Sequence, residues 1–164
     1  MFQLSRRADY AVRIMLELGL QSGEWVASRQ ISRRTNVPKA FLHKITADLV
    51  KANLVQTQAG PSGGLQLTSP VTQINLLHIL EAVEGPICLN TCLIRPQECE
   101  RDAVCPAHSF WGRLQTSIME QLQAATLSEL IKEANDLKIQ PRQRDDIPYL
   151  IHRTDVNVAE QIFP

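Results

Sequence analysis

The stretch from residue 28 to residue 68, SRQISRRTNVPKAFLHKITADLVKANLVQTQAGPSGGLQLT, determines the fold of this chain. Ser28 opens a short helix that extends to Thr35, and Asn36 is a typical turn residue. Pro38 suits the first position of a second helix, which runs to about residue 52. The buried stripe of this second helix consists of Leu42, Ile45 and Leu49. Two helices joined by a turn of three or four residues predict a helix-turn-helix, whose second helix enters the major groove of DNA.

The residues that follow weaken the alternative interpretation, a plain helical hairpin. Residues 54–57 and 65–68 read as half-buried strands, and residues 60–64 (GPSGG) form a turn between them. The glycines of this turn, Gly60, Gly63 and Gly64, permit positive φ at its tip and let backbone amides approach a phosphate closely. We therefore predict a mainly α fold, with a winged helix-turn-helix DNA-binding domain that carries a small β wing.

Helical periodicity continues on both sides of this unit. Ser5 is a credible N-cap for a helix that ends near Gly23. The apolar positions of this helix are Ala11, Ile14, Met15 and Leu18. Asn75 can cap a further helix over residues 76–83, which residues 85–86 (Gly-Pro) end.

A longer helix follows further along the chain. Its apolar residues recur at a spacing of three to four and include Trp111, Leu114, Ile118 and Leu122. Residues 126–129 (TLSE) form a capping box that opens a last short helix. A helix of roughly twenty residues is suited to dimerisation, and helix-turn-helix proteins commonly bind two half-sites as dimers. We expect a homodimer on a palindromic operator in double-stranded DNA; packing of the long helix within its own subunit is the alternative.

The charges are unevenly distributed although their sum is zero. Residues 1–68 hold nine Lys and Arg against four Asp and Glu (+5), and residues 69–164 hold eight against thirteen (−5). A basic N-terminal half is expected of a protein that contacts phosphate. The candidate phosphate contacts are Arg33, Arg34, Lys39 and Lys44, and the candidate base contacts are Ala40, Phe41 and His43. Of these, we expect Phe41 to belong to the hydrophobic core instead.

Soft metal ligands are concentrated between residues 92 and 108. Cys92, Cys99, Cys105 and His108 have the spacing C-x6-C-x5-C-x2-H, in a stretch whose prolines and acidic residues predict an irregular loop. Thiolates select iron-sulfur clusters or zinc, and imidazole binds either. The residues alone leave open an iron-sulfur cluster or a zinc ion held by a Cys3His tetrahedron. Cys88 is an additional thiol, either a plain buried cysteine or an alternative ligand.

Other classes of protein are disfavoured. The chain has no G-x-S-x-G motif, no phosphate-binding loop and no carboxylate pair with a pocket signal, so we expect no enzyme activity. It lacks an apolar signal segment and a membrane-spanning stretch, which favours a soluble cytoplasmic protein. In a reducing cytosol its four cysteines are better explained as ligands or free thiols than as disulfides. A redox or electron-transfer protein is a further alternative, but no C-x-x-C pair supports it.

The order of the elements, the GPSGG wing and the cysteine loop resemble the Rrf2 family of winged-helix regulators, and among them the IscR-type members. The similarity covers roughly residues 3–134. It includes residues 108–111 (HSFW) and 126–130 (TLSEL), which are similar to the IscR-type dimerisation region. The resemblance implies a dimeric DNA-binding protein that carries an iron-sulfur cluster.

The resemblance also implies roles for individual residues. Cys92, Cys99 and Cys105 correspond to the three cysteines that hold the cluster, and His108 matches the histidine that completes a 2Fe-2S centre in IscR-like proteins. Asp9 lies where NsrR-like members use a carboxylate of the partner subunit to complete a 4Fe-4S cluster. Asp9 is therefore the alternative fourth ligand, and the number of irons stays open.

The chain departs from the family pattern at several positions. The first gap between ligand cysteines is six residues where the IscR-type loop has five. Ala59 stands where the family usually has an arginine before its wing-tip glycines. Pro38, Ala40 and His43 replace the serines and the glutamate that are common in the recognition helix. We therefore expect weaker contacts from the wing and an operator that differs from the one IscR binds.

These expectations divide the chain into a winged helix-turn-helix region (1–85), a cluster-binding loop (86–108), dimerisation helices (109–134) and a C-terminal tail (135–164) for which disorder is the default. The predicted function is a transcriptional regulator, a repressor or an activator, whose operator affinity depends on its cluster. Such a regulator would sense iron-sulfur status, redox change or nitric oxide. A zinc-stabilised regulator without cluster sensing is the alternative.

Overall fold

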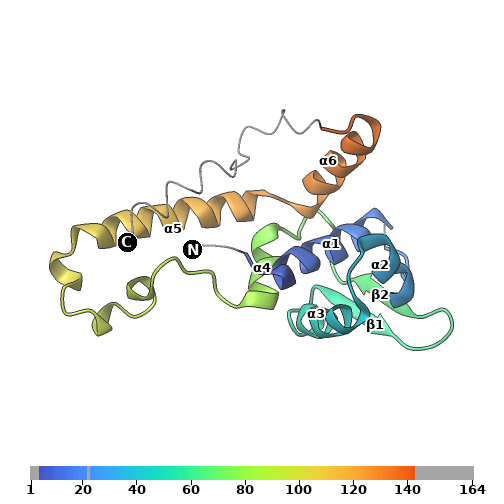
Figure 1. The fold of residues 1–164 in the computed structure, drawn as a ribbon, viewed down its shortest axis with the longest axis horizontal. Coiled ribbons are helices and arrows are strands. Elements are labelled where there is room, and N and C mark those ends of the chain that lie inside the picture. Colours follow the sequence, from blue (N-terminus) through green and yellow to red (C-terminus); the bar gives the residue numbers. More distant parts are fainter. Residues whose placement is uncertain (1–3, 22, 143–164) are drawn as a thin grey trace, which may run out of the picture. The chain divides into compact units, whose positions relative to one another are not determined.

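The computed structural model describes residues 4–21 and 23–142, and these residues are mainly helical. Their elements are α1 (Arg6–Leu20), α2 (Ser28–Thr35), α3 (Lys39–Lys51), β1 (Val55–Gln58), β2 (Gly64–Leu67), α4 (Leu76–Glu84), the 3-10 helices η1 (Thr91–Leu93), η2 (Pro96–Glu98) and η3 (Asp102–Val104), α5 (Pro106–Ala124) and α6 (Leu127–Ile139) (Figure 1). The described residues belong to two units, which divide after Lys132. The predicted fold class, mainly α with a small β wing, is confirmed.

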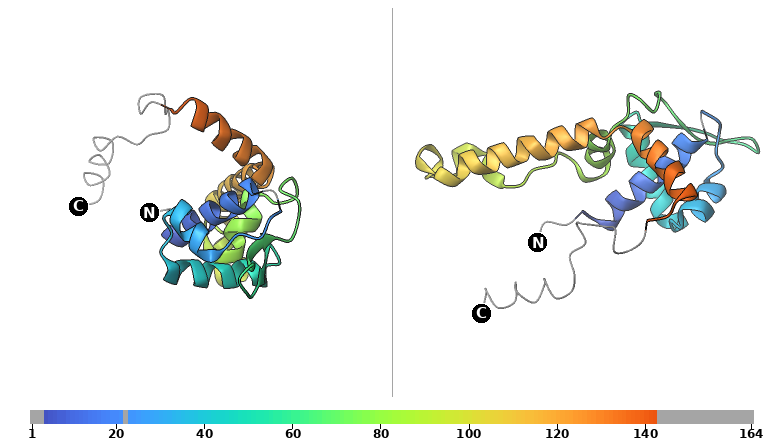
Figure 2. Two further views of the ribbon diagram at one scale, coloured as in Figure 1. Left: turned by 90° about the vertical axis from the view of Figure 1, so that its right-hand side faces the viewer. Right: turned by 90° about the horizontal axis from the view of Figure 1, so that it is seen from above.

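The hydrophobic core is built around α1. This helix contacts α2, α3 and α4, and it lies beside α4 in both views of Figure 2. Its buried residues include the predicted Ala11, Ile14, Met15 and Leu18, and α3 contributes the predicted stripe Leu42, Ile45 and Leu49. Burial of the Ile, Leu and Met side chains among them stabilises the fold by about 1.5–3 kcal/mol each. The core therefore fixes α3 in the first unit with one face turned to solvent.

Local interactions define the ends of the helices. The hydroxyl Oγ of Ser5 accepts hydrogen bonds from the backbone N–H of Arg7 (3.1 Å) and of Ala8 (3.2 Å), which caps α1 as predicted. Asn36 has φ 56°, a left-handed conformation that ends α2 and turns the chain. Pro38 is the N-cap of α3 and not its first helical residue, so the helix begins one residue later than predicted.

The wing is an antiparallel hairpin. β1 and β2 pair with Val55 opposite Leu67 and Gln58 opposite Gly64. A further bridge joins Val26 to Leu65 through two backbone hydrogen bonds of 2.9 Å. Since Val26 lies two residues before Ser28, the first residue of α2, this bridge ties the wing to the helix-turn-helix.

The segment between α5 and α6 is anchored on the first unit. The N–H of Leu127 donates to the carbonyl of Ile74 (2.7 Å), and Leu127 is fully buried. Thr126 and Glu129 form the predicted capping box, with reciprocal bonds of 3.1–3.2 Å. α6 continues past residue 134 to Ile139. Most of the predicted C-terminal tail, residues 143–164, lies outside the described residues.

Candidate nucleic-acid interface and metal centre

The exposed face of α3 carries the candidate DNA contacts. Lys39, Ala40, His43 and Lys44 are all exposed, while the buried stripe of α3 faces the core. These four residues lie in the first half of the helix, the part that enters the major groove in helix-turn-helix proteins. The structure therefore places the predicted recognition residues on one accessible surface.

Phe41 is exposed, so the expectation that it belongs to the core is wrong. Its side chain is 45% exposed, and its ring meets the ring of Tyr10 edge to face at 5.6 Å between centroids. Arg13 lies 5.8 Å from the centre of the Tyr10 ring. α1 thus supports Phe41 from one side only, and Phe41 remains available as an apolar contact to a base.

The two arginines near the end of α2 differ in their surroundings. Arg34 Nη1 lies 2.7 Å from Glu17 Oε1, an ion pair that ties α2 to α1. Arg33 is exposed and lines a shallow surface depression with Gln30 and Arg34. Arg33 is therefore the better placed of the two to meet a phosphate.

The backbone of the protein itself requires glycine at the three wing positions. Gly60 has φ +112°, a conformation that L side chains rarely adopt, as predicted for the tip. A Cβ on Gly63 would lie 2.2 Å from the carbonyl oxygen of Gln58, and a Cβ on Gly64 would lie 2.3 Å from that of Val26. The absence of a side chain at these two positions permits the tight turn and the bridge to the segment before α2.

Three short turns present the cysteines of the loop. Cys92 lies within η1, Cys99 follows η2, and Cys105 follows η3 and is the N-cap of α5. His108 lies in the first turn of α5, where its N–H donates to the carbonyl of Cys105 (3.3 Å). All four thiols of the chain are free and partly exposed. The predicted irregular loop is therefore a series of single turns, and three of them position a candidate ligand.

The groups around Cys92 alter the pKa of its thiol. The pKa of Cys92 is raised above its ordinary value, first by desolvation and then by the negative charges of Cys99, Asp102 and Cys105. A cation at this place would reverse the effect, because it favours the thiolate. The cost of forming the Cys92 thiolate beside these negative charges is what a bound cation would relieve.

His108 has an acidic neighbour that the ligand spacing alone did not identify. Its Nδ1 lies 2.5 Å from Oδ1 of Asp102, and both atoms are buried. The pair is close enough for an ion pair, but the two atoms are not aligned as a hydrogen bond and have no other partner among the described residues. A carboxylate on one ring nitrogen leaves Nε2 as the free donor atom, which is the common arrangement of metal-bound histidines.

The ligands are brought into one region without forming a closed site. In residues 4–21 and 23–142, no three His, Cys, Asp or Glu side chains are close enough together to hold a metal ion. The donor set nevertheless fits an iron-sulfur or zinc centre, because soft thiolates and a carboxylate-supported imidazole are its preferred ligands. Binding would draw the turns of the loop closer together.

Asp9 and Cys88 are engaged elsewhere. Asp9 Oδ2 lies 2.8 Å from Arg13 Nη2 in an exposed ion pair within α1. The thiol of Cys88 donates to the carbonyl of Asn90 at 2.9 Å. His108 lies at the start of α5, three residues after the candidate ligand Cys105.

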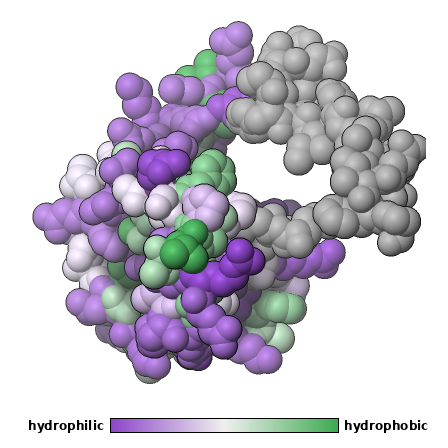
Figure 3. All heavy atoms as spheres, turned by 90° about the vertical axis from the view of Figure 1, so that its left-hand side faces the viewer, coloured by the Kyte–Doolittle hydropathy of each residue, from purple (hydrophilic) through white to green (hydrophobic). Residues whose placement is uncertain are grey.

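Apolar side chains are exposed around the loop and along α5. Ile94 is 59% exposed, Val104 78% and Phe110 50%. Figure 3 views the molecule from the left-hand side of Figure 1, and hydrophobic residues lie among hydrophilic ones on this face. α5 buries none of its residues, although its apolar stripe is the predicted one.

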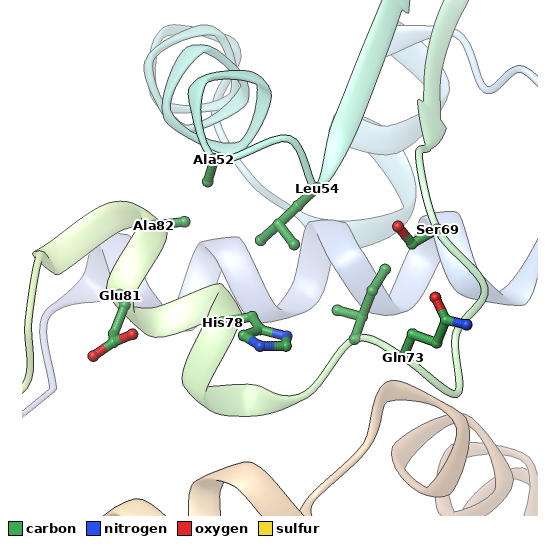
Figure 4. Close-up of a pocket in the computed structure, with 8 residues that line it drawn as sticks. Ala52, Leu54, Ser69, Gln73, His78, Glu81 and Ala82 are labelled. Carbon is green, nitrogen blue, oxygen red and sulfur yellow. The ribbon is translucent and has the colours of Figure 1, made fainter.

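A separate open groove of about 440 Å³ lies where the end of α3 meets α4. Ala52, Leu54, Ser69, Gln73, His78, Glu81 and Ala82 line it (Figure 4). None of these residues belongs to the predicted metal site or DNA surface. His78 is exposed.

Among the helices of residues 4–21 and 23–142, none has the length and the apolar composition needed to span a membrane.

A winged helix-turn-helix with an accessible basic recognition helix is the architecture of a DNA-binding regulator. Residues 4–133 match the sequence model of the Rrf2 family, described as an iron-dependent transcriptional regulator, and the chain belongs to this family. It is 31% identical over 146 residues to the regulator IscR of Vibrio atlanticus, a match that covers 88% of this chain and 84% of that protein.

Solved structures agree with this assignment. The T. potens IscR structure has a TM-score of 0.63 and 25% identity, and the match covers 87% of this chain and 93% of that one. CymR, the global cysteine regulator of B. subtilis, has a TM-score of 0.68 and 26% identity, with 81% and 98% covered. The protein is thus a DNA-binding transcriptional regulator and not an enzyme, as predicted.

Proposed function

We propose that this regulator binds a palindromic operator as a cytoplasmic homodimer and that an iron-sulfur cluster, bound by Cys92, Cys99, Cys105 and His108, controls its affinity. The observation that carries the proposal is the placement of these four residues on three consecutive turns and the start of α5. IscR-named relatives support the iron-sulfur assignment. We propose a 2Fe-2S centre, because His108 is the fourth donor within this subunit.

The proposed ligands and Asp102 have different roles in binding the cluster. The three cysteines supply thiolates, and His108 supplies Nε2 while Asp102 holds its Nδ1 side. A bound iron-sulfur cluster supplies a centre that can be oxidised, reduced or lost, and an imidazole ligand raises its reduction potential above that of an all-thiolate centre. Gathering the ligands orders residues 92–108, which lead directly into α5.

The DNA-binding part of the proposal assigns contacts by their chemistry. Arg33, Lys39 and Lys44 meet phosphates and set the salt dependence of binding, while Ala40 and His43 meet base edges. The paired recognition helices would be held apart by contacts between the α5 helices of two subunits, whose apolar stripe is exposed at Leu114. A change in the loop next to α5 can then alter the spacing of the recognition helices.

The test is anaerobic purification followed by visible absorption and by iron, sulfide and zinc analysis. We expect about two irons and two sulfides per subunit. Operator affinity should then differ between protein with the cluster and protein without it at fixed salt. One zinc per colourless subunit would favour a zinc-stabilised regulator, and equal affinity in the two states would remove the sensing role.

A further inference from the structure

Gln115, in the middle of α5, binds the first residues of the cysteine loop. Its Nε2 donates to the backbone carbonyl of Ile87 at 2.8 Å, and its Oε1 accepts from the backbone N–H of Leu89 at 2.9 Å. One side-chain amide thus pairs with both polar groups of a single stretch of backbone. This arrangement fixes the distance and the orientation of residues 87–89 relative to α5.

Gln115 lies on the same face of α5 as the candidate ligand His108. Gln115 follows His108 by seven residues, so both side chains lie on the same face of the helix, two turns or about 10 Å apart. The loop contacts α5 at both positions: Asp102 lies against His108, and the backbone of residues 87–89 bonds to Gln115. The loop is therefore fastened to one face of α5 at both of its ends.

Between these two points η1 also contacts α5, and the backbone hydrogen bonds of the loop are local. The backbone hydrogen bonds from residue 93 to residue 105 join residues three or four apart, within or between the short turns. Ile87 also packs against the hydrophobic core. Gln115 consequently connects three parts of the protein: the core, the entry to the loop and α5.

We infer that Gln115 is a positioning residue that passes the state of the cysteine loop to α5. This inference rests on the proposed function. When Cys92, Cys99 and Cys105 are drawn toward His108, the loop shortens between its two attachment points. The Gln115 amide transfers that displacement to α5, and in its absence residues 87–89 move without the helix.

The test compares Gln115→Met with the wild-type protein. Methionine has nearly the same length but no amide, so it removes both hydrogen bonds. Gln115→Glu keeps the acceptor for Leu89 and removes the donor to Ile87, and serves as a second variant. Gln123→Met is the matched control, because Gln123 is exposed on the same helix and has no side-chain hydrogen bond among the described residues.

The first measurement is operator affinity with and without the cluster, at fixed salt. For the wild type and Gln123→Met we expect the two affinities to differ on the order of 5–150-fold. For Gln115→Met we expect a ratio below about twofold, with a normal cluster spectrum and iron content. The second measurement is hydrogen exchange at the Leu89 amide, which should be about tenfold faster in Gln115→Met.

The outcomes separate the two ideas. If the operator affinity of the wild-type protein is the same with and without the cluster, the proposed function and this inference are both overturned. If the cluster changes the operator affinity of the wild-type and Gln115→Met proteins by the same factor, the inference alone is overturned. A Gln115→Met protein that folds but cannot hold a cluster also overturns it, since the residue would then serve assembly. If Gln115→Met does not fold, the same criteria apply to Gln115→Glu.

Discussion

Asp102 acts on both kinds of candidate ligand. It lies in η3, between Cys99 and Cys105, and its carboxylate is 2.5 Å from the Nδ1 atom of His108. Its negative charge is also among the causes that raise the pKa of Cys92. One carboxylate therefore lies beside the imidazole and disfavours the thiolate of Cys92 as long as no cation is bound.

The first prediction concerns this charge. In metal-free protein, Asp102→Asn removes one negative charge near Cys92, so the pKa of Cys92 falls and more thiolate is present at neutral pH. Alkylation of Cys92 should be faster than in the wild type at pH 7, and the difference should vanish at a pH well above the thiol pKa. Mass spectrometry of iodoacetamide-treated protein measures the rate.

The control for that experiment is Glu98→Gln. Glu98 lies in the same loop and pairs with Arg95 at 3.2 Å, but it is not among the groups that raise the pKa of Cys92. Equal acceleration in both variants would mean that the effect is not specific to Asp102.

A second prediction concerns Gly64. A methyl group there would lie 2.3 Å from the carbonyl oxygen of Val26, so the bridge between the wing and the segment before α2 must shift. We expect Gly64→Ala to lower the free energy of unfolding by about 1–3 kcal/mol, as measured in urea. Gly112→Ala is the control, because nothing lies within 4 Å of that position, and it should stabilise α5 by about 0.5–1 kcal/mol.

At the scale of the elements, α5 and α6 are stabilised in different ways. α6 begins with a capping box and places Leu127 in the core, whereas α5 has no buried residue. α5 contacts α4 and η1, and its Leu122 packs against the core, but none of its nineteen residues is fully buried, so it has less of the tertiary packing that normally stabilises helices. This contrast favours α5 as the element that a second subunit covers.

The capping box supplies a third prediction. Thr126→Ala removes the hydroxyl that accepts from the N–H of Glu129, which should cost about 1 kcal/mol of stability. Thermal unfolding followed by circular dichroism measures the change. Thr116→Ala is the control: its hydroxyl bonds to the Gly112 carbonyl in the interior of α5, so its loss should change stability little.

The proposed dimer supplies a fourth prediction. Leu114 is 37% exposed on the apolar stripe of α5. Leu114→Glu should shift the protein toward monomers in analytical ultracentrifugation, because it places a charge in the proposed interface. Arg113→Glu changes an exposed neighbour on the same helix and should leave the association state unchanged. Wild-type protein that sediments as a monomer at micromolar concentration would contradict the proposed dimer.

The starts of α1, α4 and α6 were predictable because their caps are local. Ser5, Asn75 and Thr126 bond to backbone N–H groups two or three residues away, so the sequence contains both partners of each interaction. The spacing of apolar residues likewise identified the core of α1 and α3. It could not place Phe41, which is adjacent to the stripe of α3, because periodicity alone does not define where a buried face ends.

Non-local contacts were not predictable in this way. The partners of Gln115 precede it by 26 and 28 residues, and the turns of the loop bring Asp102 to His108. Gly64 is needed because of the backbone of Val26, which the sequence does not reveal as a neighbour. The spacing of the cysteines identified candidate ligands, and the structure adds the side chains that hold them in place.

At the scale of the whole molecule, the sequence carries its positive charge in the half that contains α1, α2 and α3. Residues 1–68 have a balance of +5, and the exposed face of α3 contributes Lys39 and Lys44 to it. The acidic remainder of the chain limits nonspecific attraction to nucleic acid. Affinity for operator DNA should therefore depend on a small number of phosphate contacts.

A fifth prediction follows from that arrangement. Lys44→Ala should weaken operator binding and reduce the slope of log affinity against log salt concentration by about 0.9. Lys132→Ala changes an exposed lysine of α6, outside the recognition surface, and should leave the slope unchanged. Binding titrations at several salt concentrations measure both variants.

The two hydrogen bonds between Val26 and Leu65 have a consequence for the choice of target sequence. Since they join the hairpin to the segment that leads into α2, the tip of the wing and the recognition helix α3 approach the duplex with fixed geometry. Any mismatch in groove width or curvature must then be absorbed by the nucleic acid. We expect preferred sites to contain easily deformed pyrimidine–purine steps, even at base pairs that no side chain touches.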